Sequence, residues 1–319
     1  TKMKSVNEEL RKHPLYRIST FVGLALMVGF FLLLPQIFEK PTDWLRYSEI
    51  PVMLIAALSV TVLTGWAGQL SLGQFGFVAI GAYFTIKFSS GLPIPVAILF
   101  GVAFGVIAAL IVGVPALRIK GLFLAVITLG FGLAVRNWLI FNKGLSGEGG
   151  IARLAVTRAK GFDLLWWHIK GNNFHGIYWF CLLVLAIALV LVWQIRRTGI
   201  GRSIIAVRDN ENSAAAYTVS PMKMKILAFA VSGGLAALAG GLLPLISMSG
   251  NFEINPGNMV FDVDQSLRIV AVAVVGGIAS ITGAAIGTIL IVALPILFDG
   301  TPQVKLFASG IGMLIVLLY

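Results

Sequence analysis

Two runs of glycine and small polar residues interrupt the most apolar parts of this chain. The first is Gly68-Gln69-Leu70-Ser71-Leu72-Gly73-Gln74, and the second runs from Gly276 to Gly283 and holds Ser280 and Thr282. Their amide and hydroxyl groups offer neutral hydrogen bonds. The spacing of Gly277 and Ser280 repeats that of Gly68 and Ser71. This chemistry suits the passage of a small polar solute.

Two interpretations of these interruptions stay open. Irregular backbone at membrane depth is tolerated where it is buried in protein or lines a water-filled cavity. Paired interruptions in the two halves of a transporter indicate the substrate route. The alternative is that the glycines only allow close helix packing. Both interpretations apply to the polar residues of the two runs, which are Gln69, Ser71, Gln74, Ser280 and Thr282.

The composition places both runs in a membrane protein. Of 319 residues, 58% are hydrophobic and 12% are charged, against about 25% charged in a typical soluble protein. Mean hydropathy is +0.94. The single Cys181 excludes a disulfide scaffold, and the three histidines form no ligand-spaced cluster with it. We therefore predict no metal centre and no cofactor in this chain.

Apolar stretches predict an all-α, polytopic transmembrane helical bundle of eight to ten spans with broken or re-entrant segments. The uncharged stretch 50–86 would be about 55 Å long as one helix, whereas the hydrocarbon core is roughly 30 Å thick. It must fold back, and we place the break at Gly65 to Gln74. A second break falls at Gly276 to Ser280. The predicted spans are 18–38, 50–64, 73–90, 94–114, 121–141, 176–195, 225–247, 264–279, 281–297 and 303–319.

The net charge of +11 follows the positive-inside rule and does not indicate a nucleic-acid partner. The basic loops 1–17, 115–120 and 196–225 fall on one side of the predicted topology, and the acidic loops 39–49 and 248–268 fall on the other. The basic side is predicted to be cytoplasmic. The chain then divides into a cytoplasmic N-terminal segment, 1–17, and a transmembrane domain, 18–319.

Loop 196–225 is the longest of the predicted cytoplasmic loops. Its middle, from Ser203 to Tyr217, is predicted to form a short amphipathic helix with charged flanks. Such a helix suits docking into a groove on a soluble partner. The alternative is a basic loop that sets the topology and contacts anionic lipid.

The chain lacks the residues needed to drive transport by itself. No phosphate-binding loop of the G-x-x-x-x-G-K-[ST] type occurs. No pair of carboxylates lies inside a predicted span, as is common in proton-coupled carriers. Energy would have to come from another subunit, or the chain would act alone as a facilitative carrier or channel. A membrane-embedded enzyme is disfavoured, because no His, Cys or acidic cluster lies at the span ends.

Four segments resemble the permeases of bacterial ABC importers for branched-chain amino acids, most closely the LivM type of the LivH/LivM group. Gly65 to Gln74 followed by Gly81-Ala82-Tyr83 is similar to the family's GYAGQLSLGHxxFxxIGAY. The other three segments resemble LRLRGxYLAIxTLxF, SRxGRAxxAIRDNE and GGxGSxxG, and they are Leu117 to Phe131, Thr198 to Glu211 and Val275 to Gly283. Together the four segments span roughly residues 50–297.

The resemblance implies a non-enzymatic permease subunit in the bacterial or archaeal plasma membrane. It implies as partners a second LivH-like permease, two cytoplasmic ATPase subunits that bind ATP, and an extracytoplasmic solute-binding protein. Loop 196–225 would be the coupling loop, with Arg202, Arg208, Asp209, Asn210 and Glu211 at the ATPase. Thr128 would line the solute route with the polar residues of the two runs.

The resemblance leaves the solute open and includes one departure in the coupling loop. Branched-chain amino acids are the expected solutes, and the alternatives are urea or short amides, sugars and nucleosides. After Glu211 the family has the pattern xAAxxxGI, whereas this chain has Thr218 at the position of the glycine.

Overall fold

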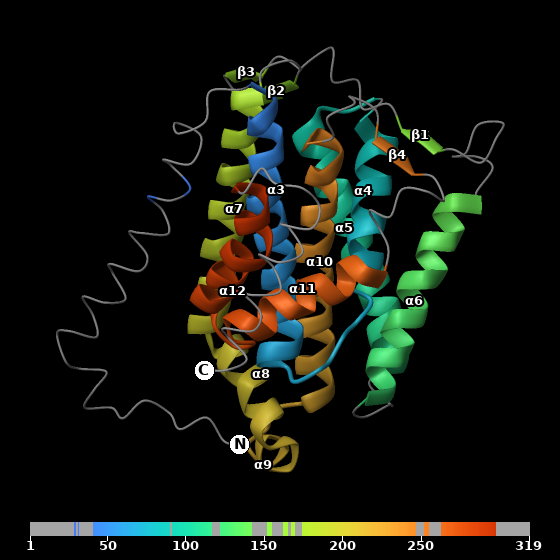
Figure 1. Ribbon diagram of the computed structural model, residues 1–319. Coiled ribbons are helices and arrows are strands. Elements are labelled where there is room, and N and C mark those ends of the chain that lie inside the picture. The colour runs from blue at the N-terminus through green and yellow to red at the C-terminus, as the bar shows by residue number, and fades with distance from the viewer. Residues whose placement is uncertain are drawn as a thin grey trace.

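A computed structural model of the chain describes residues 29, 31, 41–89, 91–116, 122–141, 152–154, 162–164, 167–169, 174–246, 252–254 and 263–297. Most of these residues are helical (Figure 1). The helices are α3 (Pro41–Val60) with the π-helical turn η1 (Thr61–Trp66), α4 (Gln74–Ser89), α5 (Ile94–Ala116), α6 (Leu122–Phe141), α7 (Phe174–Arg197), α8 (Gly199–Asp209), α9 (Glu211–Ala216), α10 (Pro221–Ile246), α11 (Val263–Gly276), α12 (Ile281–Thr288), η4 (Ile289–Ala293) and α13 (Leu294–Leu297).

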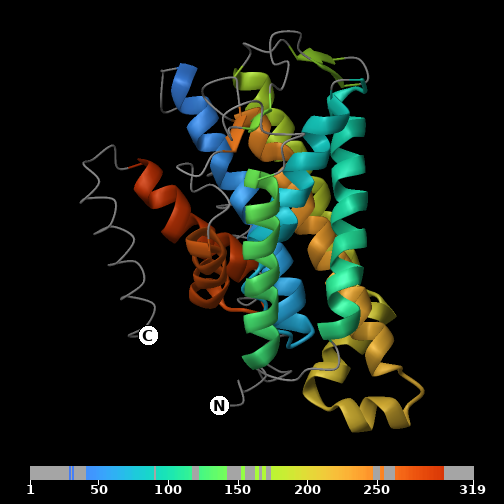
Figure 2. The same ribbon diagram turned by 90° about the vertical axis from the view of Figure 1, so that its right-hand side faces the viewer.

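Long apolar helices confirm the multi-pass membrane bundle. Four helical segments in the described part are long and apolar enough to cross a bilayer, and they are Asp43–Trp66, Ile94–Pro115, Phe174–Arg197 and Pro221–Ile246. A fifth element is the pair Asp264–Gly276 and Ile281–Leu297, which is bent by 119°. Helix α6 contains a shorter apolar segment, Phe123–Trp138, and lies at the edge of the bundle (Figures 1 and 2).

Short strands and short helices mark the two ends of the bundle. Strand β1 (Ala152–Leu154) pairs antiparallel with β4 (Phe252–Ile254), and β2 (Phe162–Leu164) pairs antiparallel with β3 (Trp167–Ile169). Figure 1 shows the strands at one end, called the upper end here, and α8 and α9 at the other, the lower end. The last turn of α5 and the first turn of α6 also lie at the lower end (Figure 2), as the predicted topology requires.

The predicted break of stretch 50–86 is confirmed. Helix α3 and η1 together run from the upper end to the lower end, and residues 67–73 then return into the bundle, where α4 begins (Figure 1). The side chain of Gln74 contacts Ser232, which lies about 16 Å along α10 from Pro221 at 1.5 Å per residue. Helix α4 therefore begins near the middle of the bundle. The predicted span 303–319 lies outside the described residues, and so does the predicted span 18–38 apart from residues 29 and 31.

The prediction for the start of the second span was wrong. We placed 39–49 in a loop and began the span at residue 50, but α3 begins at Pro41. The first half of α3 carries charged residues, and a search for charge-free stretches therefore left it out of the predicted span. In the fold, Glu49 pairs with Arg268 of α11 at 3.9 Å, and Trp44 and Tyr47 are buried on the same helix. The predicted span 264–279 starts within one residue of α11, which begins at Val263, so the acidic loop 248–268 included the first residues of that helix.

Backbone contact through glycine joins α10 to α4. A Cβ built on Gly240 would overlap the carbonyl oxygen of Val78, and one built on Gly81 would overlap the carbonyl oxygen of Ala237. Each helix therefore needs a glycine where the other approaches. This close packing of small residues is the usual way in which membrane helices gain van der Waals contact. It fixes the position of α4 against the long helix that carries Ser232.

We expect Gly240→Ala to lower the thermal unfolding temperature of the detergent-purified protein, because overpacking costs about 1–3 kcal/mol. Gly130→Ala is the matched control, since Gly130 is a helical glycine with no atom within 4 Å of its built Cβ. Gly130→Ala should leave the thermal unfolding temperature unchanged or raise it, with a stabilisation of up to about 1 kcal/mol. Equal unfolding temperatures for the two variants would contradict the backbone contact.

Candidate functional site

Two predicted route residues, Ser71 and Gln74, lie in a buried hydrogen-bond network. Gln74 Nε2 donates to Ser59 Oγ of α3 at 3.0 Å and to Ser232 Oγ of α10. Ser71 Oγ donates to Gln74 Oε1 at 3.3 Å, and Ser232 Oγ donates to the carbonyl oxygen of Ser59 at 2.8 Å. All four side chains are buried. The Gln74 amide is therefore bonded to protein, and the network joins the first break to two long helices.

Thr128 holds the other side of the first break. The backbone N–H of Leu72 donates to Thr128 Oγ1 at 3.1 Å, while this hydroxyl donates to the carbonyl oxygen of Ala125 at 2.9 Å. A Cβ on Gly73 would overlap the Thr128 carbonyl oxygen. Two residues further on, the N–H of Phe75 donates to Ser266 Oγ of α11 at 3.2 Å. Helices α6 and α11 therefore supply the partners that irregular backbone needs inside a membrane.

Gln69 differs from the other predicted residues of the first break because it is partly exposed. Its backbone is fixed, since its N–H donates to the carbonyl oxygen of Leu63 at 3.0 Å and its own carbonyl oxygen accepts from Thr64 Oγ1 at 3.2 Å. Within the part of the chain that the structure describes, its side-chain amide makes no hydrogen bond. Gln69 is thus a polar group in a fixed position that remains available to a ligand.

The second break lies between α11 and α12. Gly277 has a φ of 100°, which an L-residue rarely adopts. Ser280 is the N-cap of α12, and its Oγ accepts from the N–H of Gly283 at 3.1 Å. Ser280 Oγ also lies 2.9 Å from Thr282 Oγ1. Both hydroxyls lie at least partly exposed, so this break presents polar groups as the first one does at Gln69.

The two breaks, which are more than 200 residues apart in the sequence, meet in the fold. Trp66 Nε1 donates to the carbonyl oxygen of Ala279 at 3.2 Å, across a sequence separation of 213 residues. A Cβ on Gly65 would overlap the carbonyl oxygen of Ile278. We call Gly65, Trp66, Ile278 and Ala279 the break junction. It brings together the two glycine-rich runs that the sequence analysis singled out separately.

The predicted helix from Ser203 to Tyr217 is two helices. Helix α8 ends at Asp209, and Asn210 is extended, with its Oδ1 accepting from the N–H of Ser213 at 3.0 Å as the N-cap of α9. The single-helix prediction was wrong because Asn210 favours a cap over a helix interior. Glu211 pairs with Lys225 at 2.8 Å, which ties α9 to α10. We call α8 and α9 the lower hairpin.

Thr218 ends the lower hairpin in a conformation that favours glycine. Its φ is 65°, the one positive φ of a non-glycine residue among the described residues. The N–H of Val219 donates to the carbonyl oxygen of Ala214, and the N–H of Thr218 donates to that of Ala215, each at 3.2 Å. This is the Schellman pattern of a helix C-terminus. The turn expected from a glycine is therefore formed by threonine.

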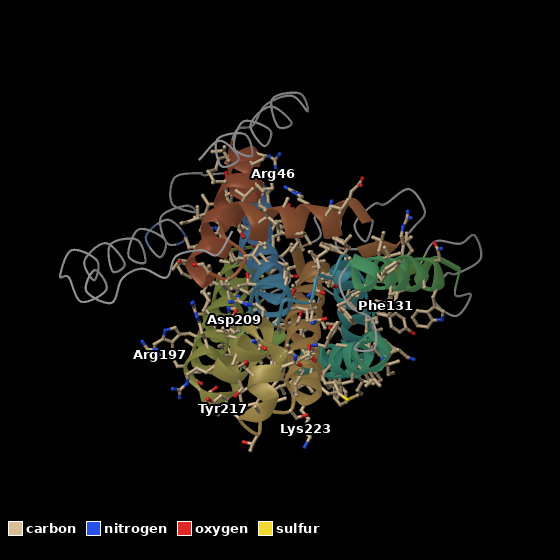
Figure 3. All side chains as sticks on the ribbon, turned by 90° about the horizontal axis from the view of Figure 1, so that it is seen from below. Arg46, Phe131, Arg197, Asp209, Tyr217 and Lys223 are labelled. Atoms are coloured by element: carbon tan, nitrogen blue, oxygen red, sulfur yellow. The ribbon has the colours of Figure 1, made fainter. Side chains whose placement is uncertain are left out.

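Arg208 connects the lower hairpin to the break junction. Its Nη1 donates to the carbonyl oxygen of Gly65 at 2.5 Å, and its guanidinium pairs with Asp209 at 2.8 Å. Seen from below, Asp209 lies beneath the bundle, whereas Tyr217 and Lys223 lie toward its rim (Figure 3). Arg202 and Asp209 are exposed. Of the predicted coupling residues, Arg208 is the one that reaches the first break.

Several functional contacts were absent from the predicted site. Ser59, Ser232 and Ser266 are single serines inside apolar helices, and their local sequence gives no sign that they face one another. Glu49 of α3 and Arg268 of α11 form an ion pair, and Arg268 Nη2 also donates to the carbonyl oxygen of Ile291 at 3.3 Å. Charges assigned to loops therefore lie on helices that cross-link the bundle.

The strained turn at Thr218 leads to a local prediction. A non-glycine residue with left-handed φ costs about 1–2 kcal/mol, so Thr218→Gly should slow hydrogen–deuterium exchange of the Val219 amide about fivefold. Tyr217→Gly is the matched control, because Tyr217 has a φ of −96° and glycine there removes no strain. Faster exchange in Thr218→Gly, or equal slowing in both variants, would contradict the assigned turn.

Similarity to known proteins agrees with this arrangement. Residues 47–318 match the family described as branched-chain amino acid transport system / permease component. The high-affinity branched-chain amino acid transport system permease protein LivM of Escherichia coli (strain K12) is 31% identical over 216 residues, covering 60% of this chain and 49% of the relative. LivM of Salmonella typhimurium is also 31% identical, over 222 residues.

A more distant relative is the autoinducer 2 import system permease protein LsrC of Salmonella typhi, 26% identical over 210 residues, which cover 64% of this chain and 56% of the relative. No solved structure matches the chain. The alignments span about half the length of these curated relatives. The family match covers most of the chain, including both breaks and the lower hairpin, so this multi-pass membrane protein belongs to the branched-chain amino acid transport permease family.

Proposed function

We propose that this chain is the membrane-spanning subunit of an ATP-driven importer and that its lower hairpin docks onto a cytoplasmic ATPase. The observation that carries this proposal is the position of the hairpin, exposed at one end of the bundle and bonded through Arg208 to the break junction. A partner that moves the hairpin would thereby act on the breaks. ATP would bind to the partner, since this chain has no phosphate-binding loop.

The charge at the lower end supports a cytoplasmic location for the hairpin. Six basic residues belong to the end of α7, the hairpin and the start of α10, and they are Arg196, Arg197, Arg202, Arg208, Lys223 and Lys225. The acids in the same region are Asp209 and Glu211. An excess of Lys and Arg is typical of cytoplasmic loops. On the same argument the N-terminal segment 1–17 is cytoplasmic.

The proposed complex has four kinds of subunit. This permease pairs with a second LivH-like permease, two ATPase subunits dock at the lower hairpins, and an extracytoplasmic binding protein delivers the solute to the upper end. The names of the LivM relatives support branched-chain amino acids as the solutes. Urea, short amides, sugars and nucleosides remain the alternatives within the same class of importer.

The proposed solute route passes the partly exposed polar groups of the two breaks. Gln69, Ser280 and Thr282 offer hydrogen bonds to a neutral or zwitterionic solute in the described conformation. Ser71, Gln74 and Thr128 are buried and bonded to protein. They hold the first break in place, and they would reach the solute only when the break rearranges during transport.

Docking is tested on the assembled importer in proteoliposomes. Arg202→Glu combined with Tyr217→Ser changes two exposed side chains of the hairpin region without touching Arg208. We expect solute-loaded binding protein to stimulate ATP hydrolysis less than in the wild type, because the docking surface is altered. Lys223→Gln is the control for lost positive charge at the same end. Wild-type stimulation in the double variant, or uptake by the lone chain in ATP-free vesicles, would contradict the proposal.

The solute route is tested by replacing each of its two glutamines with leucine. Gln69→Leu should lower the rate of solute uptake about fivefold, the effect of one hydrogen bond of about 1 kcal/mol, and leave thermal stability unchanged. Gln74→Leu should lower thermal stability, because Ser59 and Ser232 lose a buried partner. If Gln69→Leu transports at the wild-type rate, Gln69 does not line the route.

A further inference from the structure

We propose that Arg208 is a positioning residue that makes the lower hairpin and the first break move as one body. This inference rests on the proposed function, because it needs a partner that displaces the hairpin. It assigns a role that differs from docking. The guanidinium of Arg208 points into the protein toward Gly65, so its contribution to coupling lies on the membrane side of the hairpin.

The acceptor of Arg208 is a helix end that needs a donor. Gly65 lies in the last turn of η1, and the final carbonyl groups of a helix have no partner within it. Arg208 Nη1 donates to the Gly65 carbonyl oxygen at 2.5 Å. A cation at a helix C-terminus is also favoured by the helix dipole. Arg208 therefore caps the end of the helix that leads into the first break.

The backbone of the first break is shaped to admit the Arg208 side chain. Gly68 has a φ of 67° and lies over the aliphatic part of Arg208. A Cβ built on Gly68 would be 2.8 Å from Cγ of Arg208, too close for an ordinary contact, and 3.7 Å from its Cβ. Glycine is thus required at this position both by its φ and by the arginine beneath it. The contact includes the aliphatic chain of Arg208 as well as its charge.

Asp209 orients the guanidinium. Its Oδ1 accepts from Arg208 Nε at 3.0 Å and from Nη2 at 2.8 Å, which leaves Nη1 for Gly65. Asp209 is largely exposed, so the ion pair itself contributes little stability. Its effect is to select one orientation of the planar guanidinium, whose donors have a fixed geometry.

The contact continues from Arg208 to the second break. Gly65 packs against Ile278, and its neighbour Trp66 donates to the carbonyl oxygen of Ala279 at 3.2 Å. The guanidinium of Arg196, at the end of α7, lies 6.0 Å from the Trp66 ring centroid. Two arginines from the lower end therefore hold consecutive residues of η1. A shift of α8 that preserves these bonds carries both breaks with it.

The physical link is tested on the chain alone, in lipid nanodiscs. Arg208→Ala should raise hydrogen–deuterium exchange of the Ala67 and Gln69 amides about tenfold, because losing a charged hydrogen bond loosens the end of η1. These amides donate to Val62 and Leu63. Arg202→Ala, on the exposed side of the same helix, is the control and should leave both rates unchanged. Unchanged rates in Arg208→Ala would overturn the link.

The role in transport is tested on the assembled importer by measuring solute taken up per ATP hydrolysed. Arg208→Ala should lower this ratio about tenfold, and Arg208→Lys should restore part of it, since Lys also donates to a carbonyl oxygen. Lys223→Gln is the control for charge. A wild-type ratio in Arg208→Ala overturns the inference and leaves the proposed function intact. Absence of ATP-driven uptake in the wild type itself overturns both.

Discussion

Backbone groups inside a membrane must find hydrogen-bond partners within the protein, and this requirement governs how the first break is built. Residues 67–73 leave the helical pattern, and side chains from three helices bond to the backbone in these residues and beside them. Thr128 accepts from the backbone of Leu72, Ser266 accepts from that of Phe75, and Arg208 donates to that of Gly65. The break is therefore an irregular segment with fixed contacts on every side that the structure describes, and each contact comes from a different element.

This arrangement would let the proposed solute route and the proposed coupling element share one junction. The buried network of Gln74, Ser59 and Ser232 fixes the upper part of the break to α3 and α10. Below it, the bonds of Gly65 and Trp66 join the lower hairpin and the second break. Motion of the hairpin would thus act on the polar groups of both breaks through short, directional contacts. Such coupling needs a structural element that can adopt two arrangements, and the proposed ATPase would shift the equilibrium between them.

The sequence predicted features that depend on local composition. Both breaks were located from charge-free stretches, because a straight helix of that many residues would be longer than the bilayer is thick. The charges of the loops also matched the end of the bundle at which the hairpin lies. Features that depend on contacts between residues far apart in the sequence could not be predicted from local composition. The charged first half of α3 is helical and pairs Glu49 with Arg268 across the bundle, and Ser232 resembles any other small residue of α10 in the sequence. The two runs of glycine suggested paired sites, but no local pattern shows that Gly65 and Ile278 touch.

The central claim is that the lower hairpin and the first break stay together during transport. The most direct test is a reversible covalent link in the combined variant Gly68→Cys and Arg208→Cys, since the Cβ positions lie 3.7 Å apart and disulfides need about 3.5–4.5 Å. The φ of 67° strains any side chain at Gly68, so Gly68→Cys alone is the control for that strain. Cys181 is buried and does not compete. We expect the reduced importer to take up little solute per ATP hydrolysed, and oxidation to restore uptake by replacing the lost contact. Formation of the disulfide without recovery of uptake would contradict the account.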